Sequence, residues 1–146
     1  MHTFTDTQGR AWTITLNVDA IRRVRSVLNV NLLEAIEGRL LEQLITDPVL
    51  LCDILFVVIQ PQATAESVSD EDFGRALGGD VLEAATTALL EELVDFFPSA
   101  KRIVFRKALI KLKQLETLAI NTATQRLESP ELEERMKTAL ASMSGS

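Results

Sequence analysis

The segment DPVLLCDILFVVIQP, residues 47–61, decides the fold. Asp47 followed by Pro48 is a strong helix start, because aspartate caps free N–H groups and proline suits the first helical position. The helix is apolar on every side as far as Ile59, and we expect Pro61 to end it. Such a helix lies either at the centre of a domain or in an interface, and the usual burial of long apolar runs favours the centre.

The first sixteen residues have the pattern of a β-hairpin. Trp12, Ile14 and Leu16 alternate with threonines, and the turn-prone residues 6–10 connect this strand back to one around Phe4. Because two strands alone are marginal in water, Trp12 should pack against a helix. Residues 1–16 are therefore expected to form a hairpin on a larger helical domain.

From Asn17 onward the pattern is helical. The fold class predicted is mainly α, a small helical domain (1–128) with the N-terminal two-stranded hairpin, followed by a C-terminal helix and frayed tail (129–146). The first expected helix is capped by Asn17 and has Ile21, Val24, Val27 and Leu28 on one face, and Gly38 makes the next segment, 32–45, uncertain. After the central helix we expect a polar linker (62–68), a short helix that starts at 69–72, and a helix that is capped by Asp80 and ends at 96–98. A long helix (99–127) follows, and then a last helix that is capped by Ser129 and fades into 142–146.

Composition restricts the class of protein. The 146 residues are 47% hydrophobic and 25% charged, which is ordinary for one globular domain, and the net charge of −6 disfavours nucleic acid as a partner. The single Cys52 cannot form an internal disulfide or a zinc cage. No signal peptide is visible, and the apolar run 49–59 is too short to span a bilayer, so a cytoplasmic protein without membrane partners is expected.

Residues suited to catalysis are scarce, and we expect no enzyme, no metal and no cofactor. The one histidine, His2, lies at a terminus, where chains are normally mobile. Residues 69–72 (SDED) could be read as a metal site, but the calcium-loop spacing is missing and a helix cap explains them better.

The charges are strongly segregated along the chain. Residues 26–100 contain fourteen acidic side chains and two basic ones, whereas residues 101–113 contain six basic side chains and no acidic one. This basic segment could pair with the acidic middle of the same chain, or it could dock an acidic partner or a neighbouring copy. The sequence leaves these two interpretations open, and nucleic acid is a weaker third.

Three stretches together resemble a known family. They are FTDTQGRAWTITLNVDAIRRVR (4–25), DPVLLCDIL (47–55) and SDEDFGRALGGDVLEAATTALLEELVDFFP (69–98). In order and character they resemble the tail assembly chaperones encoded by tailed bacteriophages and prophages, over about residues 4–115. The resemblance rests on the overall pattern and not on a diagnostic motif.

The resemblance implies a non-enzymatic helical chaperone in the bacterial host cell. Such a protein coats the apolar helices of a tape measure protein and helps to recruit tail tube subunits, and a frameshifted longer product is common in the family. The alternative is a structural adaptor subunit of a phage or prophage particle, at a head-tail or tail connector. The residues that we expect to bind a partner or a second copy are Phe96, Phe97, Phe105, Lys101, Arg102, Arg106 and Lys107.

Overall fold

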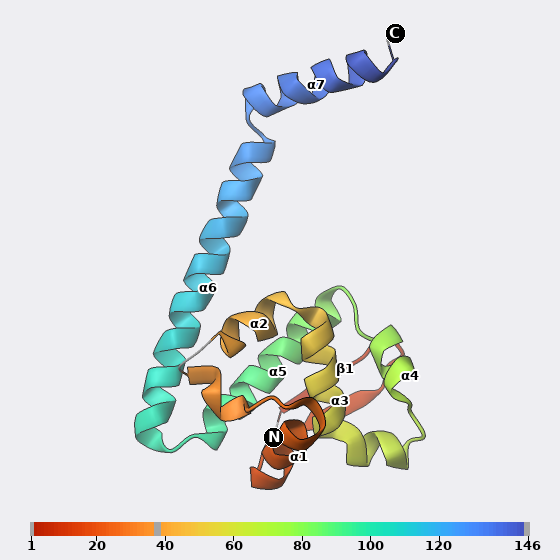
Figure 1. The fold of residues 1–146 in the computed structure, drawn as a ribbon, viewed down its shortest axis with the longest axis vertical. Coiled ribbons are helices and arrows are strands. Elements are labelled where there is room, and N and C mark those ends of the chain that lie inside the picture. The colour runs from red at the N-terminus through yellow and green to blue at the C-terminus, as the bar shows by residue number, and fades with distance from the viewer. Residues whose placement is uncertain (1, 37–38, 145–146) are drawn as a thin grey trace. The chain divides into compact units, whose positions relative to one another are not determined.

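The computed structural model describes residues 2–36 and 39–144, and it confirms a mainly α fold with an N-terminal two-stranded hairpin (Figure 1). Its contacts divide the chain into two compact units, residues 1–106 and 107–146. The division falls after Arg106, one residue beyond Phe105, which is the last buried side chain among the described residues. The boundary that the sequence suggests between residues 128 and 129 stays a prediction.

The first unit contains most of the elements. In chain order they are β1 (His2–Thr5), β2 (Ala11–Ile14), α1 (Val18–Leu28), the 3-10 helix η1 (Leu32–Ile36), α2 (Leu40–Thr46), α3 (Pro48–Ala65), α4 (Asp70–Arg75), α5 (Asp80–Phe96) and the start of α6 (Ser99–Leu127). The second unit contains the remainder of α6 and then α7 (Pro130–Ser144).

The hairpin packs on the helices as the sequence predicts. Strands β1 and β2 are antiparallel, with Phe4 opposite Trp12. Both side chains are buried, and the Trp12 ring meets the ring of Phe73 from α4 edge-on, at a centroid distance of 5.3 Å. The turn is organised by the buried carboxylate of Asp6, which accepts hydrogen bonds from the backbone N–H groups of Gln8 and Arg10 and from the indole Nε1–H of Trp12.

Helix α3 forms the centre of the first unit, as its all-apolar sequence predicts. Contacts join it to α1, α2, α4, α5 and β2. Its buried side chains are Leu51, Ile54, Leu55, Val57, Val58, Ile59 and Ala63. With 18 residues, α3 is long and apolar enough to cross a bilayer by length and composition alone, a test that the core helix of a soluble protein also passes.

The prediction that Pro61 ends this helix is wrong, because α3 continues to Ala65 and includes the first part of the expected polar linker. A proline inside a helix removes one backbone hydrogen bond. Contacts beyond it hold the last turn in place: the Gln62 amide donates to the Ala11 carbonyl (2.8 Å) and accepts from the Thr13 N–H (3.1 Å), both in β2. Ala63 is buried.

Other boundaries also differ from the predictions. The segment 32–45 is a 3-10 turn followed by the short α2, and Gly38 lies outside the described residues. Val27 is exposed, so the apolar face of α1 is narrower than expected. Gly79, with a φ of 56°, occupies the N-cap of α5, and Asp80 is the first helical residue. Helix α7 continues to Ser144 where the sequence suggested a frayed end.

Candidate functional site

The three phenylalanines that the sequence offered as a binding groove are largely inside the first unit. Phe105 is fully buried and Phe97 is 4% exposed, and only Phe96 is partly accessible. Their rings contact one another in a row: Phe96 and Phe97 meet edge-on at a centroid distance of 5.8 Å, and Phe97 and Phe105 are tilted against each other at 5.6 Å. Phe97 and Phe105 therefore have almost no surface to offer a partner, and the row packs the start of α6 against the end of α5. Partner binding at Phe96 stays a prediction.

Two of the predicted basic residues also serve the fold. The Arg102 guanidinium donates to the backbone carbonyls of Phe97 (3.1 Å) and Asp95 (3.3 Å), which are free acceptors because α5 ends there. Arg106 lies 4.0 Å from the Asp95 carboxylate. Both side chains therefore interact with groups of the same chain, which is the intramolecular interpretation of the charge pattern. Lys101 and Lys107 are exposed, and Lys107 belongs to the second unit.

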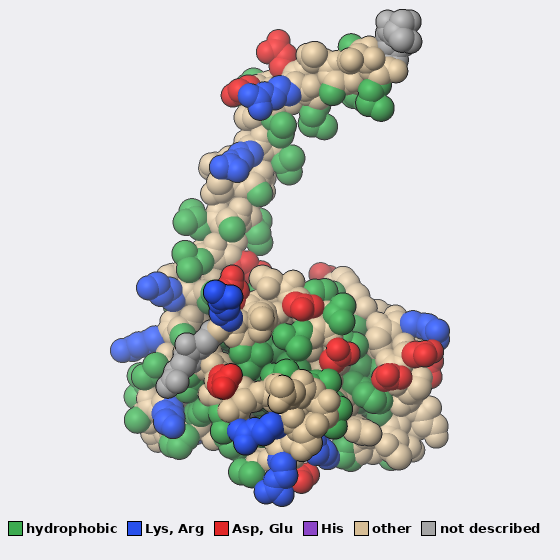
Figure 2. Space-filling model, viewed as in Figure 1, with side chains coloured by type: hydrophobic (Ala, Val, Ile, Leu, Met, Phe, Trp, Pro, Cys, Tyr) green, Lys and Arg blue, Asp and Glu red, His purple; other side chains and the backbone are tan. Residues whose placement is uncertain are grey.

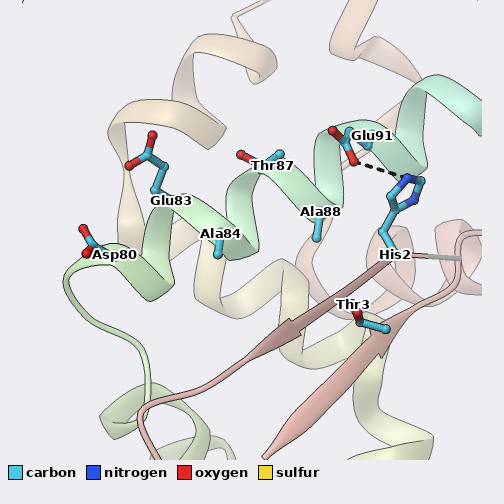
Figure 3. Close-up of a pocket in the computed structure, with 8 residues that line it drawn as sticks. All are labelled: His2, Thr3, Asp80, Glu83, Ala84, Thr87, Ala88 and Glu91. Atoms are coloured by element: carbon cyan, nitrogen blue, oxygen red, sulfur yellow. Dashed lines mark ion pairs between the residues drawn. The ribbon is translucent and has the colours of Figure 1, made fainter. Parts of the chain in front are cut away.

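His2 lies in a polar cluster that the sequence did not predict. It is held in β1 opposite Ile14, and its ring reaches three carboxylates near the end of α5. Figure 3 shows the ring beside one of them, Glu91. Its Nδ1 is 2.7 Å from Glu92 Oε2, and its Nε2 is 3.3 Å from Glu91 and 3.8 Å from Asp95. The expectation of a mobile terminal histidine is therefore wrong, because strand pairing places the ring. Only the spacing of Glu91, Glu92 and Asp95 on one helix could have indicated this cluster.

Glu92 is the buried member of the cluster. It accepts from His2 through one oxygen and from the Leu16 backbone N–H (3.2 Å) through the other. Burial by itself raises the pKa of Glu92, but these two hydrogen bonds and the nearby positive charge outweigh it, so the pKa lies below its ordinary value. Glu92 therefore ties α5 to both β1 and the segment that follows β2.

The chemistry available to this cluster is limited by the surroundings of the imidazole. A histidine that acts as a general base holds an orienting group on one ring nitrogen and a nucleophile on the other. In His2, Nδ1 binds Glu92, and Nε2 also faces carboxylates and not a nucleophile. Among the described residues, His2, Glu92 and Asp95 are the set that could offer three metal ligands, with ligand atoms within 4.8 Å of one another. Hydrogen bonds already engage both Glu92 oxygens, so the set is satisfied as a polar network between β1 and α5.

Beside this cluster, a shallow pocket of about 610 Å³ opens between β1 and α5. Figure 3 shows its lining, in which the small side chains of Ala84 and Ala88 separate the acidic groups of Asp80 and Glu83 from His2. An open, negatively lined hollow of this kind offers few apolar contacts to a small molecule.

The second unit presents the most unusual surface of the chain. None of its described side chains is buried, and eight large apolar ones are more than half exposed: Ile110, Leu115, Leu118, Ile120, Leu127, Met136, Leu140 and Met143. We call these eight residues the exposed apolar set. Figure 2 shows hydrophobic side chains standing out along α6 and α7, with basic and acidic side chains among them. Such a density of exposed large apolar side chains on two helices is typical of an interaction surface.

Comparisons with known proteins do not add a relative. No family model matches the chain, and neither a curated protein nor a solved structure shows a significant match.

Proposed function

We propose that this chain is a phage-type tail assembly chaperone, which binds apolar helices of a tape measure protein and recruits tail tube subunits. The exposed apolar set on α6 and α7 is the observation that carries the proposal. A client rich in apolar helices needs a partner whose own helices have uncovered apolar faces, because helix pairs bury such faces against each other. The family resemblance of residues 4–115 points to the same client.

The division into two units suits this role. The first unit has a buried apolar core of its own, so it can stay folded while the second unit exchanges partners. On α7 the spacing of Leu132, Met136, Leu140 and Met143 sets four apolar side chains on one face. We propose that this face contacts the client helix.

The test is co-expression of the full chain with the tape measure protein encoded near it, followed by pull-down and light scattering. The wild-type chain should keep the tape measure protein soluble in a multi-copy complex. The double variant Met136→Glu, Leu140→Glu should lose the client, because it places charges on the proposed contact face.

The matched control is Thr138→Glu, Ser142→Glu, which adds the same two charges to another face of α7 and should keep the client. Equal loss in both double variants would mean that charge alone matters. Equal retention would remove α7 from the contact, and a wild-type chain that ignores the tape measure protein would contradict the chaperone proposal itself.

The second candidate is a structural adaptor built into a particle at a head-tail or tail connector, and the same exposed apolar set supports it. A chaperone is absent from the finished particle, whereas an adaptor remains. Mass spectrometry of purified particles from a strain that expresses the chain distinguishes the two functions. Retention of the chain in stoichiometric amounts would favour the adaptor.

A further inference from the structure

We propose that the second unit pairs with a second copy of this chain, through antiparallel contact of the two α6 helices. This pairing goes beyond the proposed function and does not depend on it. It rests on three features of α6 and α7: a heptad pattern, a groove at the centre of that pattern, and opposite charges at its two ends.

The heptad pattern runs along the part of α6 that belongs to the second unit. Its positions step by four and three residues, as in a coiled coil: Ala108, Leu112, Leu115, Ala119, Thr122 and Arg126. We call these six residues the α6 seam. From Leu115 onward they are exposed, so this part of the seam has no partner within the described chain. Although it is short, a seam of this spacing can pack against another helix, as in a coiled coil.

A shallow, largely open groove of about 630 Å³ lies over the middle of the seam. Its floor consists of the small side chains of Ala119, Thr122 and Ala123. Larger apolar side chains flank it, Leu115 and Leu118 on the N-terminal side and Leu127 on the C-terminal side. Small residues at a helix crossing allow two backbones to approach closely, and larger ones at each end interlock with the partner.

The charges specify both the occupant and its direction. Residues 107–113 carry three lysines and no acid, whereas residues 116–134 carry five glutamates against a single arginine. No carboxylate among the described residues lies within 4.0 Å of Lys107, Lys111 or Lys113. In a parallel pair these lysines would face the lysines of the second copy, whereas in an antiparallel pair they lie at the C-terminal end of its α6, where Glu128 and the acidic first turn of α7 begin.

The seam also fits an antiparallel two-fold axis. If Ala119 of one copy faces Thr122 of the other, then Leu115 faces Arg126, so the four exposed seam positions lie opposite one another, and Leu112 faces Ser129 just beyond the end of α6. Such a short seam buries less than about 1,200 Å², the range of weak and reversible complexes. The proposed dimer should therefore dissociate on dilution, and raised salt should weaken it.

The first measurement is sedimentation of the full chain over a range of concentrations, without any client. A reversible monomer–dimer equilibrium is expected. Leu115→Glu should raise the dimer dissociation constant roughly 100-fold, because each dimer loses two buried leucines. Ile110→Glu is the matched control: this residue is equally exposed, on the same helix, but about 140° around the axis from Leu115, and it should leave the equilibrium unchanged.

Cysteine cross-linking tests the direction, in a Cys52→Ala background. Chains with Leu115→Cys mixed with chains with Arg126→Cys should form disulfide-linked dimers, whereas neither variant alone should do so, because identical positions lie about 16 Å apart along an antiparallel pair. Efficient cross-linking of each variant with itself would overturn the antiparallel arrangement. A strictly monomeric chain, or an oligomer that Leu115→Glu does not weaken, would overturn the pairing while leaving the test of client binding unaffected.

Discussion

Both units of this chain contain helices with many apolar side chains, but the two units differ in how far these side chains are buried. In the first unit, apolar side chains such as Leu55 from α3 and Phe73 from α4 are fully buried. In the second unit, apolar residues of the same type, such as Leu118 and Leu127, are more than 60% exposed. The hydrophobic pattern of a helix therefore shows that it needs a partner, but not whether the partner lies in the same chain.

This difference has a consequence for stability. A buried leucine contributes about 1.5–3 kcal/mol relative to an exposed one, and the described side chains of the second unit gain little of this energy within the chain. Isolated helices of 12–15 residues are only marginally stable in water, and α7 has 15. The stability of the first unit should therefore come from its own core, whereas that of α7 should increase when another molecule covers it.

The largest expected effect comes from truncating one leucine in each unit. Leu55→Ala should lower the free energy of unfolding by about 2–5 kcal/mol, because it leaves a cavity at the centre of the core. Leu118→Ala should change it by less than about 0.5 kcal/mol in dilute monomer. Urea unfolding followed by circular dichroism measures both values. Similar losses in the two variants would mean that α6 has a partner inside the chain.

The next effect tests the polar centre of the first unit. Asp6→Ala should lower the free energy of unfolding by about 2–3 kcal/mol, because it leaves the buried indole N–H of Trp12 and two backbone N–H groups without an acceptor. Asp53→Ala, which removes an exposed carboxylate on α3, is the control and should have little effect. If both variants unfold at the same urea concentration, the Asp6 turn does not stabilise the hairpin.

Much of the first unit could be predicted from the sequence, because caps and periodicity are local signals. Asn17 and Ser69 cap their helices as expected, by accepting hydrogen bonds from the backbone N–H groups of Ala20 and Asp72. The persistence of α3 beyond Pro61 could not be predicted, because it depends on hydrogen bonds between Gln62 and a strand about fifty residues earlier.

The candidate site was harder to predict for the same reason. Aromatic residues near basic ones suggested a binding surface around Phe97 and Phe105, but whether a phenylalanine is buried depends on tertiary packing. The apolar steps of the long helix, including Leu115 and Leu118, were visible in the sequence. The sequence did not show whether another element covers these side chains, and only the structure shows that no element of the described chain does so.

A smaller expected effect is the pH dependence of the free energy of unfolding, which should come from carboxylates of the first unit. Burial raises the pKa of Asp6, but hydrogen bonds from Trp12, Arg10 and Gln8 outweigh it, and the pKa lies below the ordinary 3.8. The pKa of Glu92 lies below the ordinary 4.5 through its bonds to His2 and Leu16. Because both values are depressed in the folded state, this stabilisation is present above the unfolded pKa values and is lost as the pH falls through the folded ones.

Urea unfolding of the first unit should therefore become easier as the pH falls below about 4, and Glu92→Gln should flatten this dependence. Glu133→Gln in the second unit, whose carboxylate is exposed beside Lys137, is the matched control and should not change the slope. An unchanged slope in Glu92→Gln would show that the link between α5 and the hairpin does not depend on the charge of this carboxylate.

The smallest expected effect concerns the ion pairs on α7. Arg135 lies 2.9 Å from Glu131 one turn earlier, but both side chains are about three-quarters exposed. Pairs of this kind contribute about 0.3–0.5 kcal/mol, so Arg135→Ala should barely change the helix content measured by circular dichroism. Hydrogen exchange of the α7 amides should respond far more to a molecule that covers Met136 and Leu140. If the α7 amides exchange slowly in the dilute monomer, and Arg135→Ala strongly accelerates that exchange, then local charges, and not a partner, stabilise this helix.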